Sequence, residues 1–198
     1  HFALILALAL ALMQGVLPLI GAHRNRLAWI AIARPAAQTT ALFITISFCC
    51  LVWAFVNNDF SVVYVAQHSN TLLPMEYRVA AVWGGHEGSL LLWVLMLGWW
   101  MFAVSLLSRQ LPDAMVARVL GVLGLVTAGF LLFILFTSNP FERLLPGAAE
   151  GRDLNPLLQD PGLVIHPPLL YMGYVGFSIA YAFAVAALLS GQLDAAWA

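Results

Sequence analysis

The sequence has 198 residues, of which 63% are hydrophobic and only 9% are charged. Soluble domains carry about 45–50% apolar and about 25% charged residues, so this composition excludes a soluble enzyme, a disordered tail and a disulfide-rich secreted scaffold. The net charge is −1, which leaves no strongly basic face to bind nucleic acid. The composition therefore indicates one domain embedded in a lipid bilayer. Because the chain starts at His1 and stops at Ala198, we expect a fragment of a longer protein.

Five stretches of the sequence have the length and composition of membrane-spanning helices. A bilayer core about 30 Å thick is crossed by about 20 apolar residues in a helix. The stretches are residues 2–20, 38–56, 90–107, 119–136 and 168–189. None alternates as a transmembrane β-strand does, and the first lacks the flanks of a cleaved signal peptide. We therefore predict an all-α fold, a polytopic integral membrane helix bundle with about five transmembrane helices.

The four connections between these spans differ in length and charge. The short connections, 21–37 and 108–118, hold five arginines, whereas the long ones, 57–89 and 137–167, hold three. The positive-inside rule then places the short connections in the cytoplasm and the long loops outside. Long loops on one face are where site residues usually lie. Within the first long loop, we expect residues 74–83 to form a short interfacial helix.

Two adjacent cysteines, Cys49 and Cys50, lie deep in the second span. The sequence has no CxxC or CxxCH pattern, so the chain cannot attach haem to itself through thioether bonds and has no dithiol placed for redox exchange. We expect both cysteines to be inert and packed, because free cysteine is among the most buried residue types.

A glycine-rich segment, WGGHEGS, precedes the third span and contains His86 and Glu87. Its glycines allow a tight turn, and we expect Ser89 to cap the helix that follows. An ionisable pair close to the membrane usually has a partner. Two interpretations stay open: a capped re-entrant turn with both side chains hydrogen-bonded, or a site that they line. We favour the structural interpretation over iron ligation, but we also favour the interpretation that the two side chains line a site. His68, in the same long loop, is expected to be structural or solvated.

His166 is the strongest candidate ligand, because it directly precedes Pro167 and Pro168 at the start of the fifth span. A residue before proline is disfavoured in the α region, and proline is accepted in the first helical turn. We therefore expect His166 to be extended, just before the helix, at the outer membrane edge. Such an imidazole can ligate a metal or cofactor, or it can end the loop and hydrogen-bond locally, and the residues alone leave both possibilities open.

Three segments, in order, resemble the CcmF family of cytochrome c maturation proteins, which belongs to the haem-handling protein superfamily. They are FSVVYVAQHSN, YRVAAVWGGHEGSLLLW and GRDLNPLLQDPGLVIHPPLLYMGYVGFS, and the resemblance runs from about Asp59 to the end. The family carries a tryptophan-rich periplasmic segment, the WWD domain, flanked by two histidines that ligate haem. His166 resembles the first of these. The family pattern tolerates Gln at the position of His86, which argues against ligation there. We expect the chain to be truncated before the WWD segment, and therefore inactive alone.

The resemblance implies a cytochrome c haem lyase, or holocytochrome c synthase, in the bacterial inner membrane, with the long loops in the periplasm. It would bind haem b and help to join the haem to the CxxCH thiols of apocytochrome c. The implied partners are the haem chaperone CcmE, CcmH, CcmI, apocytochrome c and membrane lipid. No catalytic residue is assigned. The candidate site-lining residues are Trp83, His86, Glu87 and Tyr171. The candidate partners of the haem propionates are Arg78, Arg143 and Arg152, since arginine binds carboxylates through two hydrogen bonds.

The main alternative is a transporter or channel subunit without haem. The glycine-interrupted WGGHEGS segment resembles the broken helices found at transporter substrate sites. Against this, the ionisable residues mostly lie at the ends of the spans rather than in their middle. A purely structural membrane subunit is a third possibility. A purified protein that stays colourless with added haem would favour either alternative, whereas a red protein that loses haem in His166→Ala would exclude both.

Overall fold

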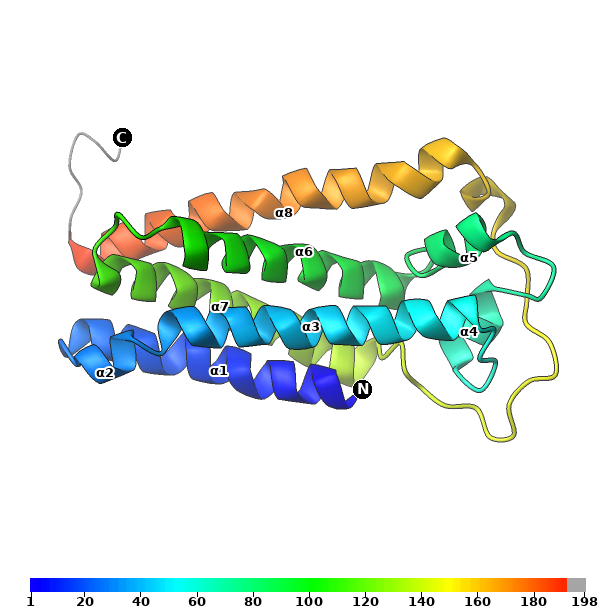
Figure 1. Cartoon of the computed structure of the whole chain (residues 1–198), viewed down its shortest axis with the longest axis horizontal. Coiled ribbons are helices and arrows are strands. Elements are labelled where there is room, and N and C mark those ends of the chain that lie inside the picture. Colours follow the sequence, from blue (N-terminus) through cyan, green and yellow to red (C-terminus); the bar gives the residue numbers. More distant parts are fainter. Residues whose placement is uncertain (192–198) are drawn as a thin grey trace.

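The structure is a computed structural model that describes residues 1–191, with only the backbone described for Leu163. The described residues are folded into helices joined by loops, with an isolated β-bridge between Val62 and Arg143 and no strand among them. Five helices are long and apolar enough to cross a membrane, and they run roughly lengthwise beside one another (Figure 1). The predicted all-α bundle with five membrane-spanning helices is therefore confirmed. Residues 192–198 of the predicted domain lie outside the described residues.

Each predicted span lies inside one long helix, and every one of these helices extends beyond the predicted limits. The long helices are α1 (Phe2–His23), α3 (Ala33–Val56), α6 (His86–Leu107), α7 (Asp113–Thr137) and α8 (Pro161–Ser190). The short elements are α2 (Leu27–Ile30), α4 (Val63–His68), α5 (Met75–Ala81) and the 3-10 turn η1 (Pro156–Leu158). The extensions arise because backbone hydrogen bonding continues into polar residues that a hydropathy criterion excludes. Helix α5 lies within the segment predicted to be a short helix.

Small residues allow α1 and α7 to pack closely. A Cβ atom on Gly124 would lie 2.9 Å from the Gly15 nitrogen, so the two backbones approach each other at this point. Helix association in membranes depends on such close packing and on polar contacts between helices. One such contact comes from Gln14, which is fully buried and donates a hydrogen bond of 2.7 Å to the Leu120 carbonyl oxygen. The resulting core joins α1, α3, α6 and α7.

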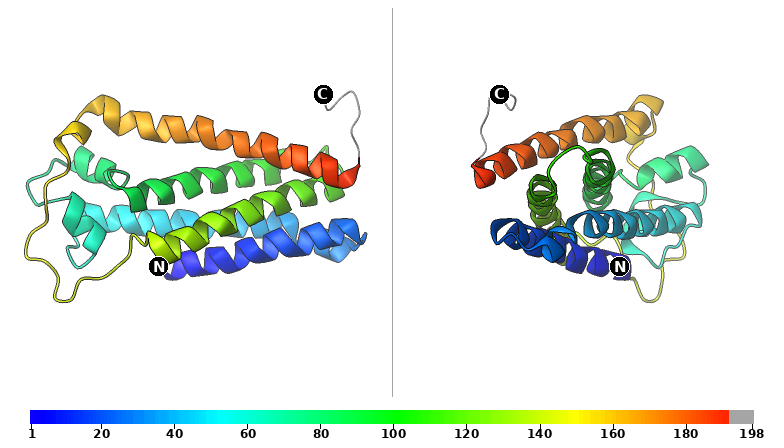
Figure 2. Two further views of the ribbon diagram at one scale, coloured as in Figure 1. Left: turned by 180° about the vertical axis from the view of Figure 1, so that it is seen from behind. Right: turned by 60° about the vertical axis from the view of Figure 1, so that its left-hand side comes forward.

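Helix α8 lies on the side of α6 and α7 that faces away from α1 (Figure 2). Only 22% of its membrane-spanning window is buried, against 56% for α6 and for α7. Two tryptophans of α6 hold it in place. The Trp93 ring lies 6.5 Å from the Tyr174 ring, and Trp100 Nε1 donates a 3.0 Å hydrogen bond to the Met172 carbonyl oxygen. One face of α8 is therefore packed against the bundle, and the opposite face is open.

The expectation that Cys49 and Cys50 are packed is wrong, because both are exposed. Helix α3 turns a different face toward the bundle. That buried face includes Ile44, Ser47 and Leu51. The cysteines lie on the other side of the helix, in the middle of an apolar span. Their low polarity fits that position as well as it fits a core.

Candidate functional site

The two long loops pair with each other at one end of the bundle (Figure 1). The Val63 amide donates to the Glu142 carbonyl oxygen at 2.9 Å, and the Leu144 amide donates to the Ser61 carbonyl oxygen at 2.8 Å. Further along, the Arg152 amide donates to the Ala66 carbonyl oxygen at 2.7 Å. Residues 57–85 and 138–160 therefore form one layer, which we call the loop cap.

Two carboxylates fasten the loop cap through side chains. Asp59 accepts hydrogen bonds from Ser61 and forms a 3.1 Å ion pair with Arg143 of the other loop. The Ser61 hydroxyl, helped by the Arg143 guanidinium, holds the pKa of Asp59 below its ordinary value. Glu150 accepts hydrogen bonds from the amide and the hydroxyl of Thr71, at 3.1 and 2.7 Å, and these bonds lower the pKa of Glu150. Both carboxylates therefore form these contacts within the loop cap best when they are ionised.

Tyr64 lies at the centre of the contact between the loop cap and the start of α6. Its hydroxyl accepts a hydrogen bond from the Gly85 amide at 2.9 Å and donates one to the Val82 carbonyl oxygen at 3.1 Å. Burial raises the pKa of Tyr64 well above its ordinary value. A Cβ atom on Gly88 would overlap the Val82 carbonyl oxygen and lie 2.7 Å from the Tyr64 hydroxyl. His68 donates from Nδ1 to the Tyr64 carbonyl oxygen at 2.9 Å, which agrees with its structural interpretation.

The glycines of the WGGHEGS segment therefore allow close packing against Tyr64. The prediction that Ser89 caps α6 is wrong. Helix α6 begins at His86, after Gly85 in an extended conformation with φ −131° and ψ 176°. The Ser89 hydroxyl instead donates to the Trp83 carbonyl oxygen at 2.8 Å. The helix starts earlier than predicted because the glycines allow its first turn to lie directly against Tyr64 and Val82.

The four candidate site-lining residues have different surroundings. His86 is exposed, with Nδ1 3.2 Å from the Ser138 hydroxyl and its ring edge-on to Phe133. Glu87 is half-buried beside it. Trp83 is half-buried, and its Nε1 is buried without a hydrogen-bond partner among the described residues. Tyr171 is half-buried against the core. His86 thus joins the start of α6 to the end of α7, and the four side chains have different neighbours.

The prediction that His166 is extended and precedes the helix is wrong. Helix α8 begins at Pro161, so His166 and the two prolines that follow it are helical. Pro161 suits the first helical position, and the Asp160 carboxylate accepts a hydrogen bond of 2.8 Å from the Gly162 amide. Because the helix has already begun at Pro161, His166 stays helical, although a residue before proline prefers an extended conformation.

The His166 side chain is exposed on the open face of α8. At 100° per residue, His166 lies opposite Val175, which is fully buried against the bundle. It shares its face with Leu170, Gly173 and Phe177. The Leu170 side chain is 51% exposed and the Phe177 side chain is 74% exposed. A Cβ atom on Gly173 would meet nothing within 4 Å. Within residues 1–191, the His166 ring has no hydrogen-bond partner, so its nitrogens are available to a ligand.

The three candidate propionate partners are not equally available. Arg78 donates to the Leu73 and Thr71 carbonyl oxygens, at 2.8 and 2.7 Å, so its guanidinium supports the first long loop. Arg143 is paired with Asp59. The Arg152 side chain is exposed and forms no hydrogen bond or ion pair within the described part of the chain. Of the three, Arg152 is therefore the one that is free to bind a carboxylate.

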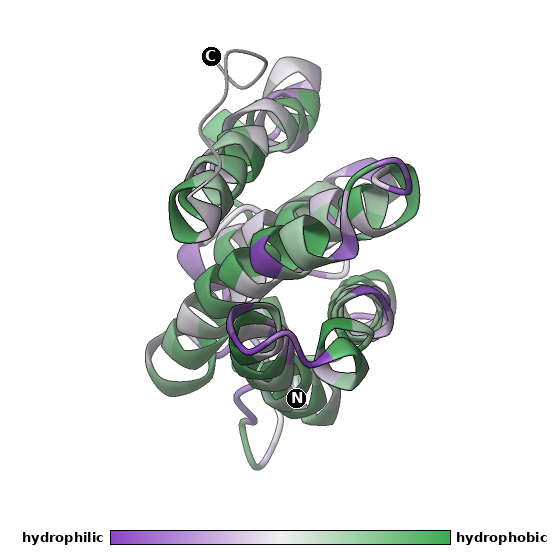
Figure 3. Cartoon of the chain, turned by 90° about the vertical axis from the view of Figure 1, so that its left-hand side faces the viewer, coloured by the Kyte–Doolittle hydropathy of each residue, from purple (hydrophilic) through white to green (hydrophobic). Residues whose placement is uncertain are grey.

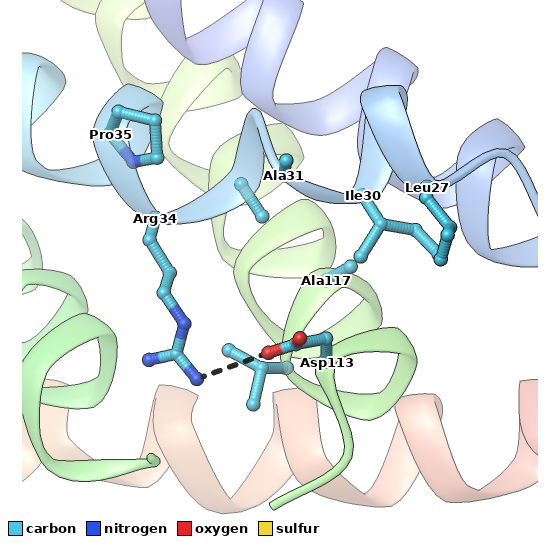
Figure 4. Close-up of a pocket in the computed structure, with 9 residues that line it drawn as sticks. Leu27, Ile30, Ala31, Arg34, Pro35, Asp113 and Ala117 are labelled. Atoms are coloured by element: carbon cyan, nitrogen blue, oxygen red, sulfur yellow. Dashed lines mark ion pairs between the residues drawn. The ribbon is translucent and has the colours of Figure 1, made fainter.

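A second polar cluster, at the opposite end of the bundle, is structural. Arg34 donates to the Ser105 and Ser108 carbonyl oxygens at the end of α6 and lies 3.7 Å from Asp113 of α7 (Figure 4). A cation at the end of a helix satisfies carbonyl groups that have no partner within the helix. Arg34 thus fastens α3 to α6 and α7, and its donors are already engaged.

The described residues contain no group of three or more His, Cys, Asp or Glu side chains that could hold a bare metal ion. A single free imidazole instead suits a cofactor that brings most of its own ligands. The porphyrin of haem is such a cofactor, because the protein then supplies only axial ligands. The flat, apolar face around Gly173 and Phe177 would suit a planar ring.

Comparison with known proteins shows which family the chain belongs to. Residues 83–196 match the model of the cytochrome c assembly protein family, which is more than half of the chain. The chain belongs to this family. It is 63% identical over its whole length to cytochrome c-type biogenesis protein CcmF of Pseudomonas aeruginosa, and 60% identical over 98% of its length to CcmF of Escherichia coli. A solved structure named cytochrome c haem lyase CcmF superposes on 98% of the chain, with a TM-score of 0.83 and 27% identity.

The chain spans about 30% of the length of these relatives and of the solved structure. Together with five apolar helices, the match to that structure makes the chain part of a multi-pass membrane protein. The resemblance noted in the sequence is confirmed. The family match begins at Trp83, so it contains the Tyr64-facing glycines and His166 but leaves out α1 and α3.

Tyr64, which organises the loop cap, was not among the candidate functional residues. Its signal was indirect, since three glycines in five residues require a neighbour that comes very close. The pairing of the two long loops was also missed. Long-range backbone pairing between irregular segments leaves no periodic pattern in a sequence.

Proposed function

We propose that this chain takes part in cytochrome c maturation by binding haem b at the periplasmic face of the membrane, with His166 as an axial ligand of the haem iron. The observation that carries the proposal is the free imidazole on the open face of α8, inside the region that matches the family. Haem, when bound, would supply the vinyl groups that react with the CxxCH thiols of apocytochrome c. The protein's contribution is to position the ring and control the iron.

The candidate residues have different tasks in this proposal. Leu170 and Phe177 offer apolar surface to the ring, and Gly173 leaves room between them. Arg152, which has no partner among the described residues, is the best candidate to bind a propionate. Arg78 and Arg143 hold the loop cap in shape and contribute to the site indirectly. His86, held by Ser138, supports the start of α6 rather than the iron.

Membership of the family supports a proposal for the partners and the location. We expect the protein to act in the bacterial inner membrane as a haem lyase, with CcmE delivering haem and with CcmH and CcmI presenting apocytochrome c. The excess of arginine in the short connections supports a periplasmic position for the loop cap. A transporter site is less well supported, because the glycines of WGGHEGS pack against Tyr64 instead of interrupting a helix at mid-membrane.

The test compares His166→Ala with His86→Ala in the purified protein and in cells lacking their own copy. We expect His166→Ala to lose most of the bound haem and most of the mature c-type cytochrome. His86→Ala should keep the haem, since its ring contacts Ser138 and Phe133. Equal haem content in His166→Ala and the unmodified protein would contradict the proposal. Loss of haem with unimpaired maturation would separate haem binding from the lyase reaction.

A further inference from the structure

The turn between α1 and α2 borders an open surface cavity of about 350 Å³ at the end of the bundle opposite the loop cap. It is lined by Leu19, Ile20, His23, Arg24 and Trp29. Figure 3 views the molecule from this end, where hydrophilic connections lie on top of mainly hydrophobic helices. The cavity thus has an apolar wall on its membrane side and basic groups at its rim. It has no part in the haem site described above.

The turn between α1 and α2, with the residues that line the cavity, is closely packed, and we call this region the corner. A Cβ atom on Gly21 would lie 2.7 Å from the Trp29 Cβ, so the glycine lets the tryptophan sit against the end of α1. Three carbonyl oxygens in the last turn of α1 accept hydrogen bonds: that of Ile20 from the Arg24 amide and that of Gly21 from the Arg26 amide, each at 2.9 Å, and that of Ala22 from a guanidinium nitrogen of Arg118 at 3.1 Å. These hydrogen bonds leave fewer free carbonyl lone pairs at the end of α1 to repel an anion.

Within the described part of the chain, the basic groups of this corner form no ion pair with an acidic side chain. His23, Arg24 and Arg26 are exposed, and the Arg26 guanidinium lies over the Trp29 ring at 5.2 Å. The ion pairs found among the described residues involve other arginines, Arg34 and Arg143. Two unpaired guanidiniums and an imidazole next to a tryptophan form a cationic site with an aromatic side. An anion is the ligand that such a site favours.

The apolar wall continues down the outer face of α1 into the membrane. Leu12 and Val16 are 42% and 44% exposed, and their spacing of four residues places them on one face, which leads to Ile20 and His23. Both are exposed hydrophobic side chains on a membrane-spanning helix. A ligand with a charged head at the rim could therefore lay a hydrocarbon chain along this face.

We propose that the corner is a binding site for an anionic phospholipid, with its phosphate between His23 and Arg24 and an acyl chain along Ile20, Val16 and Leu12. Tryptophan and arginine are favoured at the membrane interface, and basic pockets between transmembrane helices bind acidic headgroups. The neighbouring cavity of about 470 Å³ at Arg34 is a poorer site, because that guanidinium is engaged and Asp113 would repel a phosphate (Figure 4).

The test measures lipid retention by native mass spectrometry of the detergent-purified protein incubated with phosphatidylglycerol or with phosphatidylcholine. We expect the unmodified protein to retain phosphatidylglycerol selectively. The double variant Arg24→Gln/Arg26→Gln should retain about tenfold less phosphatidylglycerol. The single variants Arg24→Gln and Arg109→Gln are the matched pair, because both arginines are exposed at this end, but of the two only Arg24 lines the cavity. The conservative variant Arg24→Lys/Arg26→Lys should keep most of the retention, which separates loss of charge from misfolding.

Three outcomes would overturn the proposal. The first is equal retention of the two lipids by the unmodified protein. The second is an equal loss in Arg109→Gln, which would indicate a diffuse attraction of anions to this end of the bundle. The third is displacement of phosphatidylglycerol by millimolar inorganic phosphate, which would assign the site to a free anion without the acyl-chain contacts.

Discussion

Helices α7 and α8 are both long, apolar and close in sequence, yet they differ in how much of their surface the described chain covers. Helix α7 packs against α1 and α6 and is 56% buried in its spanning window, whereas α8 is 22% buried. The covered helix is fixed by glycines and by polar contacts such as that of Gln14 with Leu120. The uncovered helix keeps a free histidine and a row of large apolar side chains. Packing within the described chain accounts for the buried face of α7, whereas the outer face of α8 is left to contact lipid, a ligand or another segment.

The loop cap and the start of α8 differ in a similar way, in whether their polar side chains have partners. Within the loop cap, two carboxylates (Asp59 and Glu150), the buried Tyr64 and two arginines (Arg78 and Arg143) have hydrogen-bond partners. The start of α8 leaves the His166 ring unpartnered within the described residues. Residues that support the fold are thus engaged, and the residue proposed to bind haem is not.

The largest effect is expected from Gly88→Ala, compared with Gly129→Ala. A methyl group at Gly88 would overlap the Val82 carbonyl oxygen, so the start of α6 must move, and we expect a loss of about 3 kcal/mol or more in stability. Gly129 has open space where its Cβ would lie, so Ala should be neutral or stabilise α7 by about 0.5–1 kcal/mol. Thermal unfolding in detergent measures both variants. Equal stability of the two would contradict the close packing at Gly88.

A smaller loss is expected from Tyr64→Phe. The substitution keeps the ring but removes the hydroxyl that binds the Gly85 amide and the Val82 carbonyl oxygen. Leaving buried polar groups unpaired costs about 1–3 kcal/mol. Since the hydroxyl belongs to the support of α6 and not to the haem site, bound haem should be lost only in proportion to unfolded protein. Full loss of haem in a folded Tyr64→Phe protein would place the tyrosine in the site itself.

A third pair of substitutions compares the two faces of α8. Val175 is fully buried and Phe177 is 74% exposed. We expect Val175→Ala to lower the stability of the chain by about 1 kcal/mol, because it leaves a gap in the packed face. Phe177→Ala should change that stability by less than about 0.5 kcal/mol but weaken haem binding. Thermal unfolding and haem titration measure the two effects, and a reversed order would remove the distinction between the faces.

The length and apolar composition of the spans were sufficient to predict the five helices. The local conformations at Ser89 and His166 were predicted wrongly, because each prediction used one neighbouring residue as the guide. At Ser89 the contact of Gly88 with Val82 and Tyr64 decided the helix start, and these residues come from separate parts of the sequence. At His166 a helix already begun at Pro161 overrode the preference imposed by Pro167. The choice of His166 as a candidate came from its sequence context and family resemblance, which do not depend on its backbone conformation.

The smallest effect concerns the pH dependence of the loop cap. The pKa values of Asp59 and Glu150 are lowered in the folded chain, so their contribution is complete above the ordinary carboxyl pKa of about 4 and is lost as the pH falls through the lowered values. We expect faster amide exchange of Ser61 and Thr71 below about pH 4, after correction for the intrinsic rate. The double variant Asp59→Asn/Glu150→Gln should exchange quickly at every pH, and a pH-independent exchange in the unmodified protein would contradict this assignment.

The most direct test of the account is the absorption spectrum of haem bound to a His166→Gly variant, recorded with and without added imidazole. We expect the Soret band to shift or disappear in the variant, because the axial nitrogen is gone, and to return when imidazole fills the space beside α8. A Soret band that is unchanged in His166→Gly and insensitive to imidazole would show that this histidine does not bind the iron.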